Sequence, residues 1–268
     1  MKIIVTGAAT GIGAETCHLL KERGDEVYAF DIKEPGKNFD FFHQIDLSDP
    51  KAIDDVVAKV DGSFDAILNI AGVPPQPGDS PLGNGVKVLA VNFFGLRHFT
   101  LGMLGKLNEG AAIVNIASRA GGQRRDNIDQ VKALLALPED VGLEDFCTHH
   151  EIDYVRAYNL SKEAVIVWTM AQTELLLAKG LRMNTLSPGG VSTDIFEDFR
   201  QAFGTDRVDG VTKRIGRPGL PVEAAQAAIF LASPESSWIR GSDIPMDGGG
   251  MALMTSDMLK LEEFSSRV

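Results

Sequence analysis

The fold of this chain is decided near its start, where residues 2–13 read Lys2-Ile3-Ile4-Val5-Thr6-Gly7-Ala8-Ala9-Thr10-Gly11-Ile12-Gly13. The first five residues are mostly apolar and β-branched, as expected of a strand that is buried on both faces. A glycine-rich turn follows at once, and residues 14–23 then have the apolar spacing of a helix that ends at Gly24. This strand, turn and helix predict a dinucleotide site, because glycines let the backbone approach a pyrophosphate and the helix start offers free N–H groups.

An acidic residue ends the second predicted strand, residues 26–30. Asp31 stands about twenty positions after the glycines, where a carboxylate can accept hydrogen bonds from the adenosine ribose hydroxyls. The same carboxylate would repel the 2′-phosphate of NADP. Lys33 could meet such a phosphate, but Asp31 is better placed, and Ala9 and Thr10 add no cation to the turn. The pattern favours NAD and leaves additional use of NADP open.

Three polar side chains suggest proton chemistry farther along the chain. Tyr158 and Lys162 are four residues apart, so on a helix they share one face. The lysine charge is expected to lower the tyrosine pKa from its usual value of about 10, which suits a general acid/base. Ser118 follows a predicted strand, residues 112–117, where its hydroxyl can point at a substrate oxygen. The tyrosine–lysine spacing is common on exposed helices, and it gains meaning only from the dinucleotide site.

The Gly-x3-Gly-x-Gly spacing, together with Tyr158 and Lys162, resembles the short-chain dehydrogenase/reductase family in its simple, non-extended form. The resemblance covers nearly the whole chain. It implies an α/β fold with a single domain over residues 1–268: a Rossmann-like, doubly wound parallel sheet with helices on both faces. Four further strands are expected at residues 41–45, 64–70, 181–187 and 242–245.

The resemblance also implies a set of cofactor-binding positions. In relatives, the pair that matches Asp46 and Leu47 meets the adenine edge, although Asp46 could equally cap the next helix. The backbone of Val191 and the hydroxyl of Thr193 would orient the nicotinamide amide. Ile70 departs from the usual Asn-Asn-Ala-Gly turn, which is nevertheless expected to keep its shape. The whole set comprises Gly7, Thr10, Gly11, Ile12, Gly13, Asp31, Asp46, Leu47, Asn69, Ala71, Gly72, Tyr158, Lys162, Pro188, Gly189, Val191 and Thr193.

The implied reaction is reversible oxidation of an alcohol to a carbonyl, with NAD performing the hydride chemistry and no metal. Tyr158 would exchange the proton of the substrate hydroxyl, and Ser118 would hold the substrate oxygen. Lys162 would bind the nicotinamide ribose. Asn92 lies in a helix expected over about residues 84–107; in relatives such an asparagine distorts the helix and holds a water linked to the lysine. The alternative is an ordinary asparagine on a helix face.

Composition limits the other possibilities. The 268 residues are 44% apolar, which is enough for one substantial core. A formal charge of −11 argues against binding of nucleic acid, and no apolar segment approaches the length of a membrane span. The chain begins directly with its first strand, which leaves no room for a signal peptide. Cys17 and Cys147 form neither a disulfide framework nor a metal cluster. The expected partner is a small molecule, and the simplest location is the cytoplasm.

An insertion separates Ser118 from Tyr158. It covers 39 residues, 119–157, where the family usually has about a dozen, and it carries helically spaced apolar residues from Val131 to Leu137. His149 and His150 invite a metal interpretation, but without further ligands they are more typical of exposed loops. Long segments at the rim of a site commonly serve as lids, specificity loops or interfaces. Relatives associate through the helices that carry the counterparts of Asn92 and Tyr158, so the insertion could cover or extend that surface. We therefore expect a homodimer.

The substrate region is expected after the sixth strand. Residues 193–212 carry Phe196, Phe199 and Phe203, spaced like one helix face, which predicts either an apolar lid or ordinary core packing. The pattern also resembles the branch of the family that contains 3α-hydroxysteroid dehydrogenase/carbonyl reductase and coniferyl alcohol dehydrogenase. An apolar, steroid-like or cyclic secondary alcohol is therefore expected, with an aromatic primary alcohol as the alternative.

The sequence disfavours two other kinds of protein. A dinucleotide-sensing protein without catalysis would be expected to lack the pair Tyr158 and Lys162, and both residues are present. An extended-family epimerase or dehydratase would have a shorter glycine turn and a longer chain.

Overall fold

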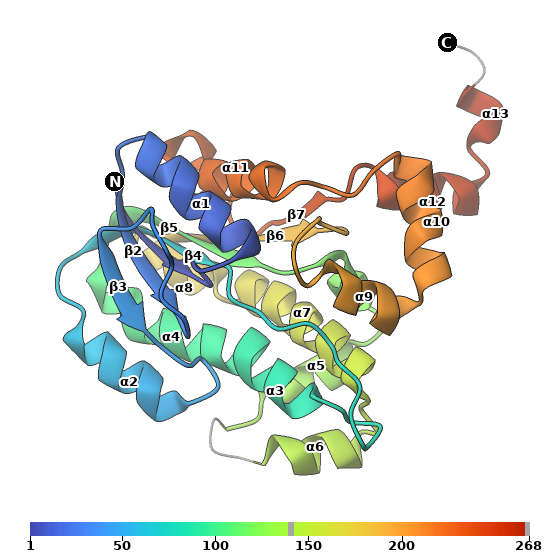
Figure 1. Ribbon diagram of the computed structural model, residues 1–268, viewed down its shortest axis with the longest axis horizontal. Coiled ribbons are helices and arrows are strands. Elements are labelled where there is room, and N and C mark those ends of the chain that lie inside the picture. Colours follow the sequence, from blue (N-terminus) through green and yellow to red (C-terminus); the bar gives the residue numbers. More distant parts are fainter. Residues whose placement is uncertain (139–141, 266–268) are drawn as a thin grey trace.

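A seven-stranded sheet forms the centre of the computed structural model, which describes residues 1–138 and 142–265. Every strand runs parallel to its neighbours, in the order β3-β2-β1-β4-β5-β6-β7. Helices cover both faces of the sheet (Figure 1), so the predicted Rossmann-like, doubly wound α/β fold is confirmed. The strands are β1 (Lys2–Thr6), β2 (Glu26–Asp31), β3 (Phe41–Gln44), β4 (Phe64–Asn69), β5 (Leu107–Ile116), β6 (Arg182–Pro188) and β7 (Asp243–Met246).

The strands agree closely with the sequence prediction, with one exception. β5 begins at Leu107 and not at residue 112. Its first four residues are partly or fully exposed, and its pairing with β4 is irregular between Phe64 and Ala66. An apolar pattern marks only the buried second half of such a strand. The parallel register brings the carboxyl ends of all the strands to one edge of the sheet, where a ligand is expected in this type of fold.

Two apolar cores lie on the two faces of the sheet. One face is covered by α1 (Gly11–Glu22) and α11 (Pro221–Ala232) (Figure 1). The other face is covered mainly by α4 (Leu96–Met103) and α7 (Tyr154–Ala171). The remaining helices are α2 (Pro50–Lys59), α3 (Gly85–Leu89), α5 (Ile128–Leu135), α6 (Leu143–His149), α8 (Thr173–Ala178), α9 (Phe196–Phe203), α10 (Thr205–Ile215), α12 (Gly250–Leu259) and α13 (Glu262–Ser265).

The long helix expected over residues 84–107 is composite. A π-helical segment, Ala90–Gly95, joins α3 to α4, and Asn92 lies inside it. The combined helix Gly85–Lys106 is long and apolar enough to cross a membrane by composition alone, with a mean hydropathy of 1.3. The prediction that no apolar segment approaches the length of a membrane span is therefore wrong for this helix. Since 61% of its most apolar part is buried, it packs here as a core helix of the domain.

The insertion begins with a 3-10 helix, Arg119–Gln123, and continues with the short helices α5 and α6 below the sheet (Figure 1). α5 packs along α7, and α6 packs beside α3. The predicted apolar face is real, because Val131 and Leu134 are fully buried. Polar contacts fasten α7 to the insertion: the buried Glu163 carboxylate of α7 accepts a hydrogen bond from Asn127 at 2.8 Å, and Arg156 of α7 donates one to Gln130 of α5 at 2.7 Å. The insertion is thus attached directly to the helix that carries Tyr158.

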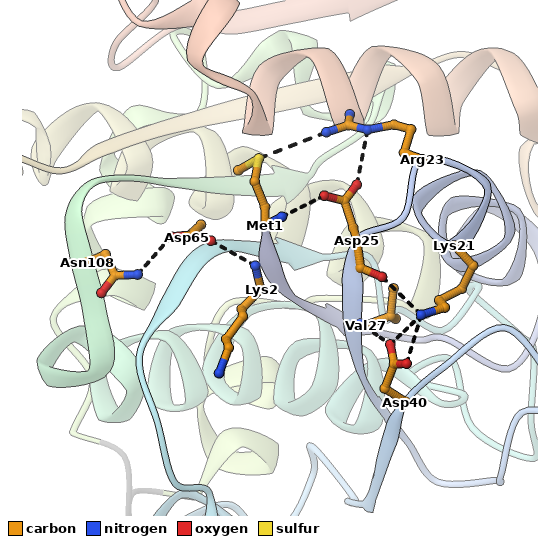
Figure 2. A network of polar contacts seen from close by, with 9 residues as sticks. All are labelled: Met1, Lys2, Lys21, Arg23, Asp25, Val27, Asp40, Asp65 and Asn108. Atoms are coloured by element: carbon orange, nitrogen blue, oxygen red, sulfur yellow. Dashed lines mark hydrogen bonds and ion pairs between the residues drawn. The ribbon is translucent and has the colours of Figure 1, made fainter.

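A polar network closes the amino ends of the strands, at the edge opposite to the ligand-binding edge (Figure 2). Asp25 accepts a hydrogen bond from the Met1 amino group at 2.9 Å, and Asp65 accepts one from the Lys2 backbone at 2.8 Å. Lys21 donates to Asp40 and to the Asp25 carbonyl oxygen. These contacts join β1, α1, β2 and β4. The network therefore stabilises the arrangement of these elements, at the end of the sheet away from the expected ligand.

Candidate functional site

One large cleft runs along the carboxyl ends of the strands. Its volume is about 1150 Å³. Nearly all of the predicted site residues line it, although they come from positions that are spread over most of the chain. They are Gly7, Thr10, Gly11, Ile12, Gly13, Asp31, Asp46, Leu47, Ala71, Gly72, Asn92, Ser118, Tyr158, Lys162, Pro188, Gly189, Val191 and Thr193.

The glycine turn requires its glycines for steric reasons. Gly7 and Gly11 have positive φ angles of 70° and 55°, in the left-handed region that favours glycine. A Cβ atom at Gly13 would lie 1.9 Å from the Gly7 carbonyl oxygen, so only glycine allows α1 to pack this closely against the turn. Thr10 precedes α1 without capping it through its side chain. The first N–H groups of α1 are therefore free to bind an anionic group in the cleft.

Asp31 lies beside this turn at the end of β2. Its carboxylate accepts hydrogen bonds from the backbone N–H of Ala9, at 2.9 Å, and of Lys33, at 3.0 Å. These bonds hold the carboxylate next to the turn while it still lines the cleft. The glycine cradle, the free helix start and this carboxylate together fit a dinucleotide with an unphosphorylated adenosine ribose.

The sequence is compatible with two roles for Asp46: contact with the cofactor and capping of the next helix. The N-cap of α2 is Asp49, whose carboxylate accepts from the N–H groups of Lys51 and Ala52. Asp46 instead accepts two hydrogen bonds from Ser48 and lines the cleft. The Ser48 hydroxyl bond is the main reason that the pKa of Asp46 lies below its usual value. Asp46 thus presents an ionised carboxylate to the cleft.

Tyr158, Lys162 and Ser118 come together at the centre of the cleft. Tyr158 and Lys162 lie on one face of α7, with the Lys162 Nζ 5.7 Å from the centre of the tyrosine ring. The Lys162 ammonium donates a hydrogen bond to the Ile116 carbonyl oxygen at 2.9 Å. Ser118 follows β5 and makes a hydrogen bond to the Tyr158 oxygen. The three side chains can therefore act on one reacting oxygen.

The expected lowering of the Tyr158 pKa is wrong. Burial raises the pKa of Tyr158 to about 12, and the hydrogen bond from Ser118 only partly opposes this. The rings of Phe199 and Phe203 pack against the Tyr158 ring, at centroid distances of 5.1 and 5.9 Å. Burial also lowers the pKa of Lys162 to about 8. The lysine charge alone would lower the tyrosine pKa, but the removal of water from both groups outweighs it.

Asn92 supports the loop next to Lys162. Its side chain accepts a hydrogen bond from the Val73 N–H at 2.8 Å and donates one to the Val73 carbonyl oxygen at 3.0 Å. These two hydrogen bonds hold the loop close to Asn92 and Lys162. A Cβ atom added at Gly72 would lie 3.2 Å from the Asn92 Oδ1 and 3.7 Å from the Lys162 Nζ. The alternative of an ordinary asparagine on a helix face is wrong, since Asn92 is fully buried.

Asn69 is the one predicted site residue that does not line the cleft. Its side chain donates hydrogen bonds to Thr100 and Asn115, both at 2.8 Å, and only 2% of the residue is exposed. Side chains alternate between the faces of a strand, and Asn69 shares the α4 face with Ile67. Its bonds connect β4 to α4 and β5, so its role is in the core.

The predicted lid consists of α9 and α10, separated by Gly204. Phe196, Phe199 and Phe203 all line the cleft, and none of the three is fully buried. Phe196 lies against Gly190, while the other two cover Tyr158. Phe199 and Phe203 also pack against the apolar core on the α7 side of the sheet, so this segment both borders the cleft and contacts the core, and its action as a lid stays a prediction.

Several residues that line the cleft lie outside the set predicted from the sequence. Arg119 lines the cleft directly after Ser118, and its Nε lies 3.3 Å from the Asp247 carboxylate. Met251 and Met254 of α12 also line the cleft. The signal available in the sequence was weak: an arginine next to Ser118, and methionines three residues apart near the end of the chain.

Neither His149 nor His150 lines the cleft: His149 is the exposed last residue of α6, and His150 follows it in a turn. The His150 ring packs against Phe146, with the centroids 4.4 Å apart. Over residues 1–138 and 142–265, no group of three or more His, Cys, Asp or Glu side chains is arranged to hold a metal ion.

Two family models match the chain. The model described as short chain dehydrogenase matches residues 1–129, and the model described as Enoyl-(Acyl carrier protein) reductase matches residues 141–251. The chain is 34% identical to coniferyl-alcohol dehydrogenase of Pseudomonas sp. (strain HR199 / DSM 7063), over 92% of this chain and 95% of that protein. It is 30% identical to 3-alpha-hydroxysteroid dehydrogenase/carbonyl reductase of Comamonas testosteroni, over 94% and 97% of the two chains.

A solved structure resembles the fold as a whole. The 3-alpha-hydroxysteroid dehydrogenase of Pseudomonas sp. B-0831, complexed with NADH, superposes with a TM-score of 0.78 at 29% identity. The match covers 95% of this chain and 98% of that one.

Proposed function

The chain belongs to the short-chain dehydrogenase family, and we propose that it is an NAD-dependent oxidoreductase that interconverts an apolar secondary alcohol and its ketone. The observation that carries this proposal is the meeting of Tyr158, Lys162 and Ser118 at the centre of a cleft that begins in a glycine cradle. The NADH-bound relative from Pseudomonas sp. B-0831 supports the choice of cofactor. The carboxylate of Asp31 beside the cradle supports NAD over NADP.

The cleft residues divide the binding of the cofactor among them. The free N–H groups at the start of α1 hold the pyrophosphate, and Asp31 accepts hydrogen bonds from the adenosine ribose. Asp46 and Leu47, which also line the cleft, would meet the adenine edge. The segment that contains Pro188, Gly189, Val191 and Thr193 orients the nicotinamide amide, and Lys162 reaches the nicotinamide ribose. When bound, NAD supplies the hydride acceptor of the reaction.

The proton chemistry belongs to the side chains of the protein. In oxidation, Ser118 donates a hydrogen bond to the substrate oxygen, and Tyr158 accepts the proton of the substrate hydroxyl. Because burial raises its pKa to about 12, Tyr158 needs added positive charge to act as a base near neutral pH. Lys162 lies next to the ring and provides part of that charge, and the nicotinamide cation adds to it. A water-linked path through Asn92 then returns the proton to solvent.

The substrate class is inferred from the phenylalanine side chains that pack over the site. Phe199 and Phe203 pack directly over Tyr158, and Phe196 extends the same apolar surface toward Gly190. Ligand pockets of this kind are mainly apolar, with a few polar groups that fix orientation. The relatives named for 3-alpha-hydroxysteroids support a steroid-like or cyclic secondary alcohol. The relative named for coniferyl alcohol favours an aromatic primary alcohol as the alternative.

A substrate panel tests this proposal. The purified protein is mixed with NAD and with steroid alcohols, cyclic alcohols, cinnamyl-type alcohols and small polyols, and the NADH absorbance is followed. We expect the highest kcat/KM with the steroid or cyclic alcohols, because their apolar bodies fill the space below the phenylalanines. Activity confined to sugars or polyols would contradict the apolar site. NADH binding without turnover of any alcohol would favour a dinucleotide-sensing protein.

The location of the protein is inferred from its thiols. Cys17 and Cys147 are free and buried. Burial raises the pKa of Cys17 to about 12 and of Cys147 to about 11, so neither is a reactive thiolate. Unpaired cysteines support a reducing compartment, and we propose the cytoplasm.

We predict that the protein is a homodimer in solution. The helices through which relatives commonly associate correspond here to the Gly85–Lys106 helix and α7, and the insertion packs against both. The insertion therefore covers part of the helix surface through which a tetramer would have to associate. Light scattering over a range of protein concentrations should give the mass of two chains. A stable tetramer at all concentrations would contradict the prediction.

A further inference from the structure

Helix α12, which precedes the short last helix α13, lies beside α10 of the proposed lid and is held mainly by polar contacts. At its start, the Asp247 carboxylate accepts hydrogen bonds from the N–H groups of Gly249 and Met251, at 3.0 and 2.9 Å. Near its end, Asp257 forms a two-pronged ion pair with Arg214 of α10, at 2.6 and 3.1 Å. Only Gly250 of α12 is buried. Apolar core packing therefore contributes little to the position of this helix.

The same contacts connect α12 to the reacting centre. Asp247 also faces Arg119, with 3.3 Å between the Arg119 Nε and the carboxylate. Arg119 directly follows Ser118, the proposed contact to the substrate oxygen. A Cβ atom at Gly248 would lie 2.4 Å from the Ile215 side chain, so the last turn of α10 packs against the beginning of α12. The helix thus occupies a defined place relative to Ser118 and to the lid.

Methionine side chains of α12 face the cleft. Met251 and Met254 are three residues apart, share one helix face and line the cleft. They are 36% and 50% exposed, so apolar surface is available to a ligand. Val211 and Ile215 of α10 line the same end of the cleft. Methionine adapts its shape to irregular apolar surfaces because it is unbranched and its sulfur is polarizable.

We propose that α12 forms the far wall of the substrate site and that Met251 and Met254 select alcohols long enough to reach it. The inference rests on the proposed function and narrows its substrate class. Phe199 and Phe203 cover the reacting end beside Tyr158, while α12 contacts the distal end of the substrate. A rigid, fused-ring apolar alcohol gains both contacts, whereas a single-ring alcohol gains only the first.

A double substitution, Met251→Ala with Met254→Ala, tests the wall. Alanine is the best helix former, so the helix is retained while the apolar wall is removed. The matched control is Met258→Ala, which makes the same change one turn farther along the helix, where the side chain is 74% exposed and outside the cleft lining. The two test alcohols are a 3-hydroxysteroid and cyclohexanol, assayed with NAD. Steroid binding is also measured by calorimetry, and thermal unfolding shows that each variant is folded.

We expect the double variant to lose at least about tenfold in kcat/KM and in affinity for the steroid, while cyclohexanol changes by less than about twofold. Met258→Ala should leave both alcohols unchanged. Equal losses for the two alcohols, or equal effects of the double variant and the control, would overturn the inference. If the wild type binds the steroid but oxidises neither alcohol, the proposed function fails. The calorimetric comparison of the double variant with Met258→Ala then still decides whether α12 contacts the ligand.

Discussion

Replacing Tyr158 with phenylalanine is expected to lower kcat at least about 100-fold, the usual effect of losing a general acid/base. The substitution removes only the hydroxyl group and keeps the ring that packs against Phe199 and Phe203. NADH affinity should therefore change little, because the glycine cradle and Lys162 remain. The measurements are steady-state turnover with the best alcohol of the panel and NADH binding by fluorescence.

The matched control is Tyr154→Phe, one turn earlier on α7. This substitution removes the same hydroxyl from a residue that does not line the cleft. The turnover of the Tyr154→Phe variant should therefore equal that of the wild type. Wild-type turnover in Tyr158→Phe would remove this residue from the mechanism. A loss of turnover in both variants would instead indicate a general disturbance of α7.

Cofactor preference is expected to be the second large effect. The wild type should show a kcat/KM for NAD at least about 100-fold higher than for NADP, which corresponds to a few kcal/mol of discrimination. The Asp31 carboxylate is held beside the glycine turn by the N–H groups of Ala9 and Lys33. It can accept hydrogen bonds from an unmodified ribose, and it would repel a 2′-phosphate at the same place.

The variant Asp31→Asn should reduce this preference by at least about tenfold, because it removes the charge and keeps the shape of the side chain. Glu34→Gln is the matched control: it removes a negative charge three residues away, at an exposed position outside the cleft lining, and should leave the ratio unchanged. Equal kcat/KM values for the two cofactors in the wild type, or a preference for NADP, would contradict the assignment to Asp31.

The electrostatics of the reacting centre could be read from the sequence only in part. The proximity of Tyr158 to Lys162 was predictable from their spacing of four residues on a helix, and the structure confirms it. The direction of the tyrosine pKa did not follow, because it depends on how much water the surrounding residues remove. Phe199 and Phe203 arrive from a different part of the chain, and burial raises the pKa of Tyr158 to about 12.

Asn69 illustrates a similar limit. Its place at the end of β4 was predictable from the apolar pattern of the strand. The face toward which its side chain points depends on which residues lie above and below the sheet, and Thr100 and Asn115 supply its hydrogen-bond partners. A family pattern locates such a residue near the cofactor turn without distinguishing a contact to the cofactor from a contact within the core.

By itself, the sequence determined the Rossmann-like fold, the glycine turn of the cleft and the placement of Tyr158 and Lys162 on one face of α7. These features depend on local signals, since strand and helix periodicity, tight glycine turns and residues one helical turn apart involve neighbours in the chain. The tertiary structure alone decided that α12 meets the lid and that the insertion packs on α7 and α3. Such contacts join segments far apart in the chain, and their partners are selected by the packing of whole surfaces, which no local pattern records.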